Sequence, residues 1–255
     1  MPLKQQLPAE LEPFRAKIEK SLRPFVQIRP VPGSEPNLWS SRFGGWPYLT
    51  AVDAYPFRAD GAPLYLLAQL NFEELPALDR WPRQGLLQLF VSDDDLHGLD
   101  LDEPLEQTGF QVRYYPEIRS SALVEEFGFV PDPDMLPISE GCALAFHRRE
   151  GPVTLTDFRA EALLPEILES DELYELYEGT FPSGGHRLGG YPFFTQQDLR
   201  SYGQHLRDYE LLLQMDTDDE VGMMWGDCGV GNFFIRPADL ERRDFSRVIY
   251  NWDCC

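Results

Sequence analysis

Short apolar or aromatic runs, each bounded by Gly, Pro or Asp, recur along most of the chain. Such runs are typical of β-strands. The strands predicted in this way are Val26–Val31, Leu64–Leu70, Gly85–Val91, Phe110–Tyr115, Cys142–His147, Tyr209–Met215, Asn232–Ile235 and Val248–Trp252. Because few helical patterns separate these runs, we expect an α+β fold with a largely antiparallel sheet rather than a doubly wound parallel sheet.

Two stretches have the spacing of an amphipathic helix, with apolar residues recurring every three or four positions. The first covers residues 8–22, and the second lies within residues 161–178, where Ser170 is a plausible N-cap. Each predicted helix opens one half of the chain. This placement suggests that the two halves are organised alike.

The pattern also repeats at the level of residues. Arg42–Asp53 returns 145 positions later as Arg187–Asp198, with six of twelve positions identical. At the same offset Leu66–Asn71 matches Leu211–Asp216, with three of six positions identical. Matches of this density at a fixed offset are the signature of an internal repeat.

We therefore expect one domain over residues 1–255, built by internal duplication of two similar, mostly antiparallel β units. Repeat one would span residues 1–135 and repeat two residues 155–255, with residues 119–141 as the connection. A few helices would flank the units, and the two units would pack as one pseudo-two-fold body. A chain of 255 residues is long enough to bury a substantial core in either arrangement.

The repeated Gly-Gly-aromatic-Pro sequence holds an aromatic side chain at a defined angle, because glycine permits positive φ and proline fixes its own φ. The aromatic residues are Trp46 and Tyr191. Two interpretations remain: a turn with an aromatic core anchor, or an aromatic-lined binding groove.

Polar residues follow the paired apolar runs, namely Gln69 and Asn71 in one half and Gln214 and Asp216 in the other. A buried glutamine amide needs partners for both its oxygen and its nitrogen. These side chains either satisfy backbone groups at the strand ends or face an extended peptide added to a sheet edge.

The charge narrows the possible partners. The chain has 43 acidic and 22 basic residues, a formal net charge of −21. This charge disfavours nucleic acid and favours a cationic protein segment. The densest basic runs, His147–Arg149 and Arg242–Arg243, are short. Acidic runs at Asp93–Glu106 and Asp216–Glu220 follow the paired strands, and they would form a binding surface if they lay on one face.

Catalytic and metal-binding signatures are absent from the sequence. We find no nucleophile elbow, phosphate-binding loop or metal-ligand spacing, so no catalytic residue, metal or cofactor is expected. No signal peptide or membrane-spanning run is evident, and four cysteines do not make a disulfide scaffold. These features favour a cytoplasmic location, with no membrane partner; the oligomeric state is left open.

The order of several motifs carries a family resemblance. The motifs are Gly44–Pro47, Leu67–Asn71, Leu188–Pro192, Leu212–Asp216, Trp225–Gly229, Phe233–Ile235 and Asp244–Ser246. In this order they resemble the YwqG-like bacterial proteins, a family of uncharacterised function. That family is more distantly similar to the domain of programmed-cell-death protein 2, which resembles a dedicated chaperone of a ribosomal protein. The zinc-binding module of the eukaryotic proteins has no counterpart here.

The resemblance and the charge together predict a non-enzymatic protein- or peptide-binding module with a chaperone-like role. The candidate ligand-binding residues are Trp46, Gln69, Asn71, Tyr191, Gln214, Asp216 and Asp227. One alternative is an immunity-type protein that neutralises a cognate toxin. Another is a hydrolase that uses Asp216 and Asp227 as an acid and base pair.

Overall fold

The computed structural model describes residues 3, 6–34, 36–100, 104–120, 122–138 and 140–255. Within these residues ten strands form one sheet, in the order β10-β9-β8-β7-β1-β6-β2-β3-β4-β5. Every neighbouring pair of strands is antiparallel. The strands are β1 (Arg23–Val31), β2 (Arg42–Phe43), β3 (Leu64–Asn71), β4 (Leu86–Ser92), β5 (Phe110–Tyr115), β6 (Cys142–Gly151), β7 (His186–Gly189), β8 (Glu210–Asp216), β9 (Val230–Ile235) and β10 (Ile249–Asp253).

All eight strands predicted from the apolar runs are present, and the antiparallel sheet is confirmed. The sequence pattern missed β2 and β7. These strands are short, and they begin with the polar residues Arg42 and His186 rather than with an apolar run. Their place in the sheet is set by neighbouring strands instead of by a hydrophobic pattern of their own.

The helices are shorter and more broken than predicted. The first is a 3₁₀ turn, η1 (Glu12–Phe14), followed by α1 (Arg15–Ser21). The second region divides into α2 (Ala160–Leu163), α3 (Pro165–Leu168) and α4 (Asp171–Thr180). The first break falls at Pro165, which lacks the amide needed to continue a helix, and the second falls just before α4 begins. Ser170 caps α4 as predicted, since the Leu173 N–H donates to its Oγ at 3.3 Å. The remaining elements are η2 (Leu199–Tyr202), η3 (Gln204–Leu206), η4 (Asp219–Val221) and α5 (Pro237–Arg242).

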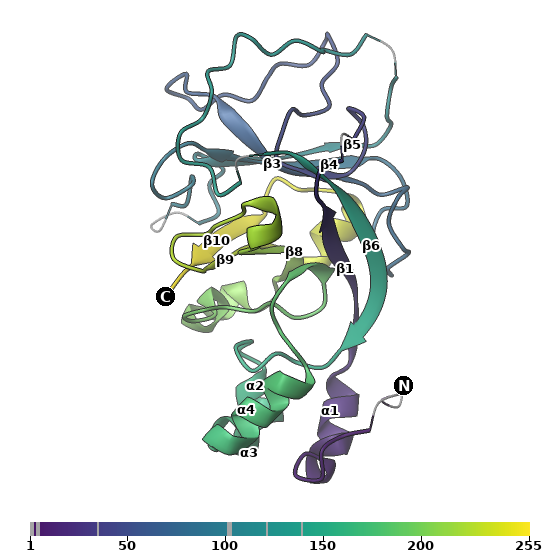
Figure 1. Cartoon of the computed structure of the whole chain (residues 1–255), viewed down its shortest axis with the longest axis vertical. Coiled ribbons are helices and arrows are strands. Elements are labelled where there is room, and N and C mark those ends of the chain that lie inside the picture. Colours follow the sequence, from purple (N-terminus) through teal and green to yellow (C-terminus); the bar gives the residue numbers. More distant parts are fainter. Residues whose placement is uncertain (1–2, 4–5, 35, 101–103, 121, 139) are drawn as a thin grey trace.

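The sheet curls so strongly that it forms a nearly closed barrel (Figure 1). β3, β4 and β5 form one wall, and β8, β9 and β10 form the wall facing it. The long strands β1 and β6 run along one side between the walls (Figure 1). The two edge strands approach each other through Phe110 of β5 and Tyr250 of β10, whose ring centroids are 5.4 Å apart.

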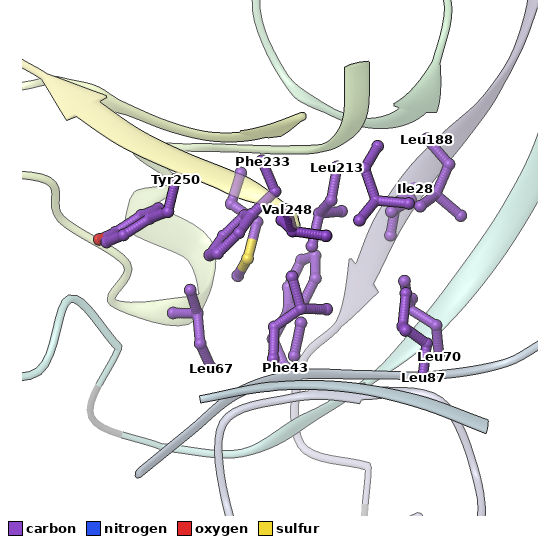
Figure 2. Close-up of a cluster of buried hydrophobic side chains, with 14 of the residues drawn as sticks. Ile28, Phe43, Leu67, Leu70, Leu87, Leu188, Leu213, Phe233, Val248 and Tyr250 are labelled. Atoms are coloured by element: carbon purple, nitrogen blue, oxygen red, sulfur yellow. The ribbon is translucent and has the colours of Figure 1, made fainter. Parts of the chain in front are cut away.

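The main core fills the space between the walls. Its side chains are almost completely shielded from solvent, and they come from both halves of the chain. Figure 2 shows the residues that meet from the two walls, among them Leu67, Leu70, Leu87, Leu213, Phe233 and Tyr250. Burying each such side chain is worth about 1.5–3 kcal/mol, so each wall depends on the other for its stability.

The central strands are flanked in the same way on both sides. β1 and β6 pair along their length, with Gln27 opposite His147 near the middle. β2 to β5 extend the sheet beyond β6, and β7 to β10 extend it beyond β1. On each side, the pairing of the first long strand with the next strand shifts in register. The shift lies at Leu66/Ala68 in β3, which pairs with β4, and at Leu211/Leu213 in β8, which pairs with β9.

Candidate functional site

An arginine anchors the Gly-Gly-aromatic-Pro turn in each half. The Arg42 guanidinium donates to the Trp46 carbonyl (3.2 Å) and to two carbonyls of the preceding loop. The Arg187 guanidinium donates to the Tyr191 carbonyl (3.5 Å) and likewise to two carbonyls before its turn. Both glycines of each turn have positive φ, between +59° and +75°, which a Cβ atom disfavours. The turn is therefore fixed by its own backbone and by an arginine that sequence analysis had not singled out as a site.

Gln69 is fully buried on β3. Its Oε1 accepts hydrogen bonds from the Tyr48 N–H (2.7 Å) and from the Gln88 amide (2.8 Å). Its Nε2 donates to the carbonyls of Leu38 and Ser40, both at 2.8 Å. The amide thus ties the turn and the loop before β2 to the sheet.

Gln214 has the same role on β8. Its Oε1 accepts from the Phe193 N–H (2.7 Å), and its Nε2 donates to the carbonyls of Gly185 (2.7 Å) and Ser183 (3.3 Å). The Asn232 amide donates to the Phe193 carbonyl at 2.8 Å, just as the Gln88 amide donates to the corresponding carbonyl in the first half at 2.7 Å. Both predicted glutamines therefore satisfy backbone groups, and a direct contact with a ligand stays a prediction.

Asn71 and Asp216 lie at the ends of β3 and β8. The Asn71 amide donates to the Trp39 carbonyl (3.2 Å) and accepts from the Glu73 N–H (3.0 Å). The Asp216 carboxylate accepts from the Gly185 N–H at 2.6 Å. These two polar side chains thus fasten adjacent loops to the strand ends.

The two predicted aromatic residues have different surroundings. Trp46 is 40% exposed and stacks on Phe127, with ring centroids 4.8 Å apart. Tyr191 is buried, and its hydroxyl donates to the Ser21 carbonyl at 2.8 Å. Burial raises the pKa of Tyr191, although the charge of Arg23 above its ring opposes that rise. Tyr191 is a core anchor, whereas Trp46 is available at the surface.

Trp46 belongs to a group of aromatic side chains around Phe127. Tyr55 lies within 5.4–6.2 Å of the rings of Phe57, Phe127 and Phe129, measured between centroids. Phe57 and Phe129 are 46% and 56% exposed. Exposed aromatic clusters are common at protein interfaces.

The loop after β4 and the loop that contains Met224 are joined through the segment 134–138, whereas Asp218 and Glu220 of the second acidic run line a pocket beside β1. In the first loop, the Asp93 carboxylate accepts from the N–H groups of Asp134 (3.0 Å) and Met135 (2.6 Å). Between β8 and β9, the Met224 N–H donates to the Pro137 carbonyl at 2.7 Å. The segment 134–138 therefore bridges the two loops.

A direct contact also joins these loops to the last strand. The Trp252 indole N–H donates to the Leu96 carbonyl at 2.7 Å. His97 packs between Trp225 and Trp252, with ring centroids 5.8 Å and 5.2 Å away. Burial lowers the pKa of His97, while the neighbouring Asp94 carboxylate acts in the opposite direction.

Exposed acidic and apolar side chains around these contacts form what we call the acidic-apolar face. It consists of Asp95, Leu96, Asp132, Asp134, Met135, Met224 and Asp227, all exposed. Asp102 and Glu103 of the first acidic run lie outside the described residues. Of the predicted site residues, only Asp227 belongs to this face.

A pocket of about 650 Å³ lies where β1 runs beside the start of β7. It contains the one close His–Asp pair of the described residues, His186 and Asp218, with 3.2 Å between Nε2 and Oδ2. This hydrogen bond lowers the pKa of Asp218. The Asp216 N–H donates to the other ring nitrogen, Nδ1, at 3.0 Å. A general base needs a nitrogen free to reach its substrate, so this pair orders the loop after β8 rather than forming a catalytic dyad.

The two carboxylates proposed as an acid and base pair, Asp216 and Asp227, have different surroundings. Both Asp216 oxygens are engaged, by the N–H groups of Gly185 and Thr217, and Asp227 lies in an exposed turn. Neither carboxylate lines the pocket beside β1.

The described residues contain no group of three or more His, Cys, Asp or Glu side chains placed to hold a metal ion. The four cysteines are free thiols. Among the residues that the structure describes, no helix has the length and apolar character needed to cross a membrane.

Together the fold and the site define an antiparallel sheet protein whose walls share one core and whose loops form an acidic face with exposed apolar residues. The chain belongs to the family described as Domain of unknown function (DUF1963), which matches residues 41–254. A search of the curated proteins found no match.

Proposed function

We propose that this protein is a non-enzymatic protein-binding module that takes a cationic, amphipathic protein segment on its acidic-apolar face. The observation that supports the proposal is the meeting of the first acidic loop with the segments 132–135 and 224–227 around exposed apolar side chains. Leu96, Met135 and Met224 are 43%, 48% and 42% exposed, and each comes from one of three segments in contact. Methionine is well suited to such a surface because its side chain is flexible and polarisable.

The charge of the chain supports this choice of partner. A net charge of −21 attracts a cationic segment over the length set by salt screening, about 8–10 Å at physiological ionic strength. Exposed carboxylates at the rim then select for lysine and arginine, while the apolar side chains supply burial. Charge would govern the association rate, and apolar contact would govern how long the complex lasts.

The proposal also covers the group within the family to which the protein belongs and the origin of its two halves. We infer that it is a YwqG-like member of its family and that its halves arose by internal duplication. The match of Gln69 and Gln214 in partners and geometry supports duplication, as does the equivalent position of β2–β5 and β7–β10 about β1 and β6. The distant similarity of that family to an escort of a ribosomal protein supports a chaperone-like role. An immunity-type protein that captures a basic toxin is a narrower version of the same function.

A fluorescence anisotropy titration with a labelled synthetic peptide of leucine and lysine tests this function. Asp95→Asn/Asp134→Asn removes two charges from the face, and Glu172→Gln/Glu175→Gln removes two from the exposed side of α4. We expect the first pair to weaken binding about fivefold and the second to change it less than about twofold, since each exposed charge pair is worth up to ~1 kcal/mol. Equal effects would mean that charge attracts the peptide everywhere, and the proposed face would be wrong.

The apolar part of the face has its own control. Met135→Ser should weaken binding about tenfold by removing buried apolar contact, whereas Val52→Ser, at a side chain 85% exposed on another loop, should leave it unchanged. Unchanged binding by Met135→Ser would restrict the interaction to charge alone.

A further inference from the structure

β6 has an uncovered edge. On one side it pairs with β1 from Gly151 to Ala143. On the other side only Cys142 and Ala143 pair, with the two residues of β2. In the part of the chain that the structure describes, no strand pairs with the outer side of residues 144–151. Figure 1 shows this stretch of β6 on the outside of the molecule, with no strand drawn beside it.

The prolines of β1 indicate which backbone groups of β6 point outward. Pro24 lies opposite Glu150 and Pro30 lies opposite Leu144. Proline has no N–H, so it belongs at strand positions whose amide does not face the partner strand. Residues opposite each other share this orientation, and it alternates along an antiparallel pair. The N–H and C=O groups of Leu144, Phe146, Arg148 and Glu150 therefore face the uncovered edge.

The repeated glutamine explains why the edge stays open. The chain before β2 would have to continue along β6 to cover it. Instead, the carbonyls of Leu38 and Ser40 accept from Gln69, and the Trp39 carbonyl accepts from Asn71. This loop is thereby held against the end of β3 and away from β6.

The side chains beside the edge differ between the two faces of the strand. Leu144 and Phe146 are partly buried and pack against the main core. Side chains alternate across a strand, so His147 and Arg149 lie on the opposite face. His147, Arg148 and Arg149 are exposed, as is Arg29 on β1, although the chain as a whole is strongly acidic.

We propose that this edge binds an extended protein segment with alternating apolar and acidic side chains, by β-strand addition to β6. The added backbone would use the outward N–H and C=O groups over residues 144–150, about 20 Å at the rise of a strand. Apolar side chains of the segment would lie beside Leu144 and Phe146, and its carboxylates beside His147 and Arg149. A basic edge of this kind selects against basic segments, so its partner is distinct from that of the acidic-apolar face.

The test uses a labelled synthetic peptide, Thr-Val-Glu-Val-Glu-Val-Thr, in anisotropy titrations with the wild-type protein. Two further peptides carry N-methyl groups, one on the valine amides and the other on the glutamate amides. Successive amides of a strand point to opposite edges, so methylation on one set blocks pairing with β6 and methylation on the other set leaves it intact. We expect one methylated peptide to bind like the parent and the other to bind at least about tenfold more weakly.

Protein variants locate the peptide on β6. Arg148→Pro removes an outward N–H without removing a hydrogen bond to β1, and Arg148→Ala removes the same charge while keeping the backbone. We expect at least about tenfold weaker binding for Arg148→Pro and only about threefold for Arg148→Ala. Thermal unfolding of Arg148→Pro should resemble that of wild type, because the lost amide faces solvent.

Three results would overturn the proposal. The first is no binding of the parent peptide at millimolar concentration, and the second is equal binding of the two methylated peptides. The third is a dimer in analytical ultracentrifugation that Arg148→Pro converts to monomer, because the edge would then belong to a second copy of the chain. Replacing glutamate by lysine in the peptide should weaken binding, and an unchanged affinity would also contradict the charge selection.

Discussion

Replacing Gln69 by leucine tests whether the repeated glutamines hold the fold together. Leucine has a similar volume and no hydrogen-bonding group. The change removes four hydrogen bonds of 2.7–2.8 Å, to Tyr48, Gln88, Leu38 and Ser40. Replacing a ligand-contacting side chain would weaken ligand binding, whereas replacing Gln69 should lower the free energy of unfolding.

The loss in free energy of unfolding depends on how well each group that loses its hydrogen bond to Gln69 is shielded from water. The Tyr48 residue is buried, so its N–H bears the full cost of about 1–3 kcal/mol for an unpaired group. Leu38 and Ser40 are only half-buried, so water can reach their carbonyls and each costs less. The Gln88 amide keeps its bond to the Tyr48 carbonyl (2.7 Å). We expect a loss of about 3 kcal/mol in the free energy of unfolding, out of the ~5–15 kcal/mol of a typical protein.

Urea denaturation followed by tryptophan fluorescence measures this loss directly. At about 2–4 °C per kcal/mol for a chain of this size, the melting temperature should fall by about 6–12 °C. Gln214→Leu should cost a similar amount, because its amide binds the turn of the second half in the same way. Gln204→Leu is the matched control at an exposed position, and its effect should stay within about 0.5 kcal/mol.

A free energy of unfolding for Gln69→Leu within about 1 kcal/mol of the wild-type value would refute a structural role for this amide, since unpaired buried groups cost at least that much. In that case water or a rearranged loop would replace the amide, and Gln69 would be free for a role in binding. Loss of stability together with retained affinity for the cationic peptide would separate the scaffold from the acidic-apolar face.

Two further predictions concern backbone and pH. Gly190→Ala should destabilise the protein more than Gly185→Ala. Both glycines have positive φ, which costs a residue with a side chain about 1–2 kcal/mol. Only at Gly190 would the new Cβ also lie 2.9 Å from Phe25. Equal melting temperatures for the two variants would contradict this. His97 has a lowered pKa, so its contribution is complete above its unfolded pKa of about 6.5 and is lost as pH falls through its folded pKa. His97→Asn, which suits the φ of +50°, should therefore flatten the fall in urea midpoint between pH 7.5 and 5, and an unchanged slope would assign that fall to other groups.

Most of the sheet could be predicted from the sequence because its long strands are marked by apolar runs. β2 and β7 could not, since a strand of two or four residues held between neighbours needs no hydrophobic pattern of its own. The break between α2 and α3 follows from Pro165, which the apolar spacing alone does not register. The nearly closed shape depends on contacts between residues far apart in sequence, such as Phe110 and Tyr250.

The candidate site was harder to predict than the fold. The repeat pointed to Gln69 and Gln214, and the structure explains their repetition by a shared structural task. Asp198, the last residue of the repeated motif, caps η2 by accepting from the Arg200 N–H, and it also pairs with the fully buried Arg200 guanidinium at 2.6 Å. Such an ion pair depends on which loops meet in the fold, so no local sequence pattern predicts it. The exposed Leu96 and Met135 escaped notice for the same reason, because single apolar residues in loops are unremarkable until loops gather.

The net charge conceals two regions of opposite character. Carboxylates dominate the acidic-apolar face, whereas the exposed stretch His147–Arg149 of β6 is basic. Global charge alone would predict attraction of cationic partners at every surface. Because the screening length is about 8–10 Å, shorter than the ~20 Å of the β6 edge, a local cluster such as His147–Arg149 sets the field felt by a bound strand. Raising ionic strength should thus weaken the binding of both the basic and the acidic peptide, whereas an effect of net charge alone would weaken the first and strengthen the second.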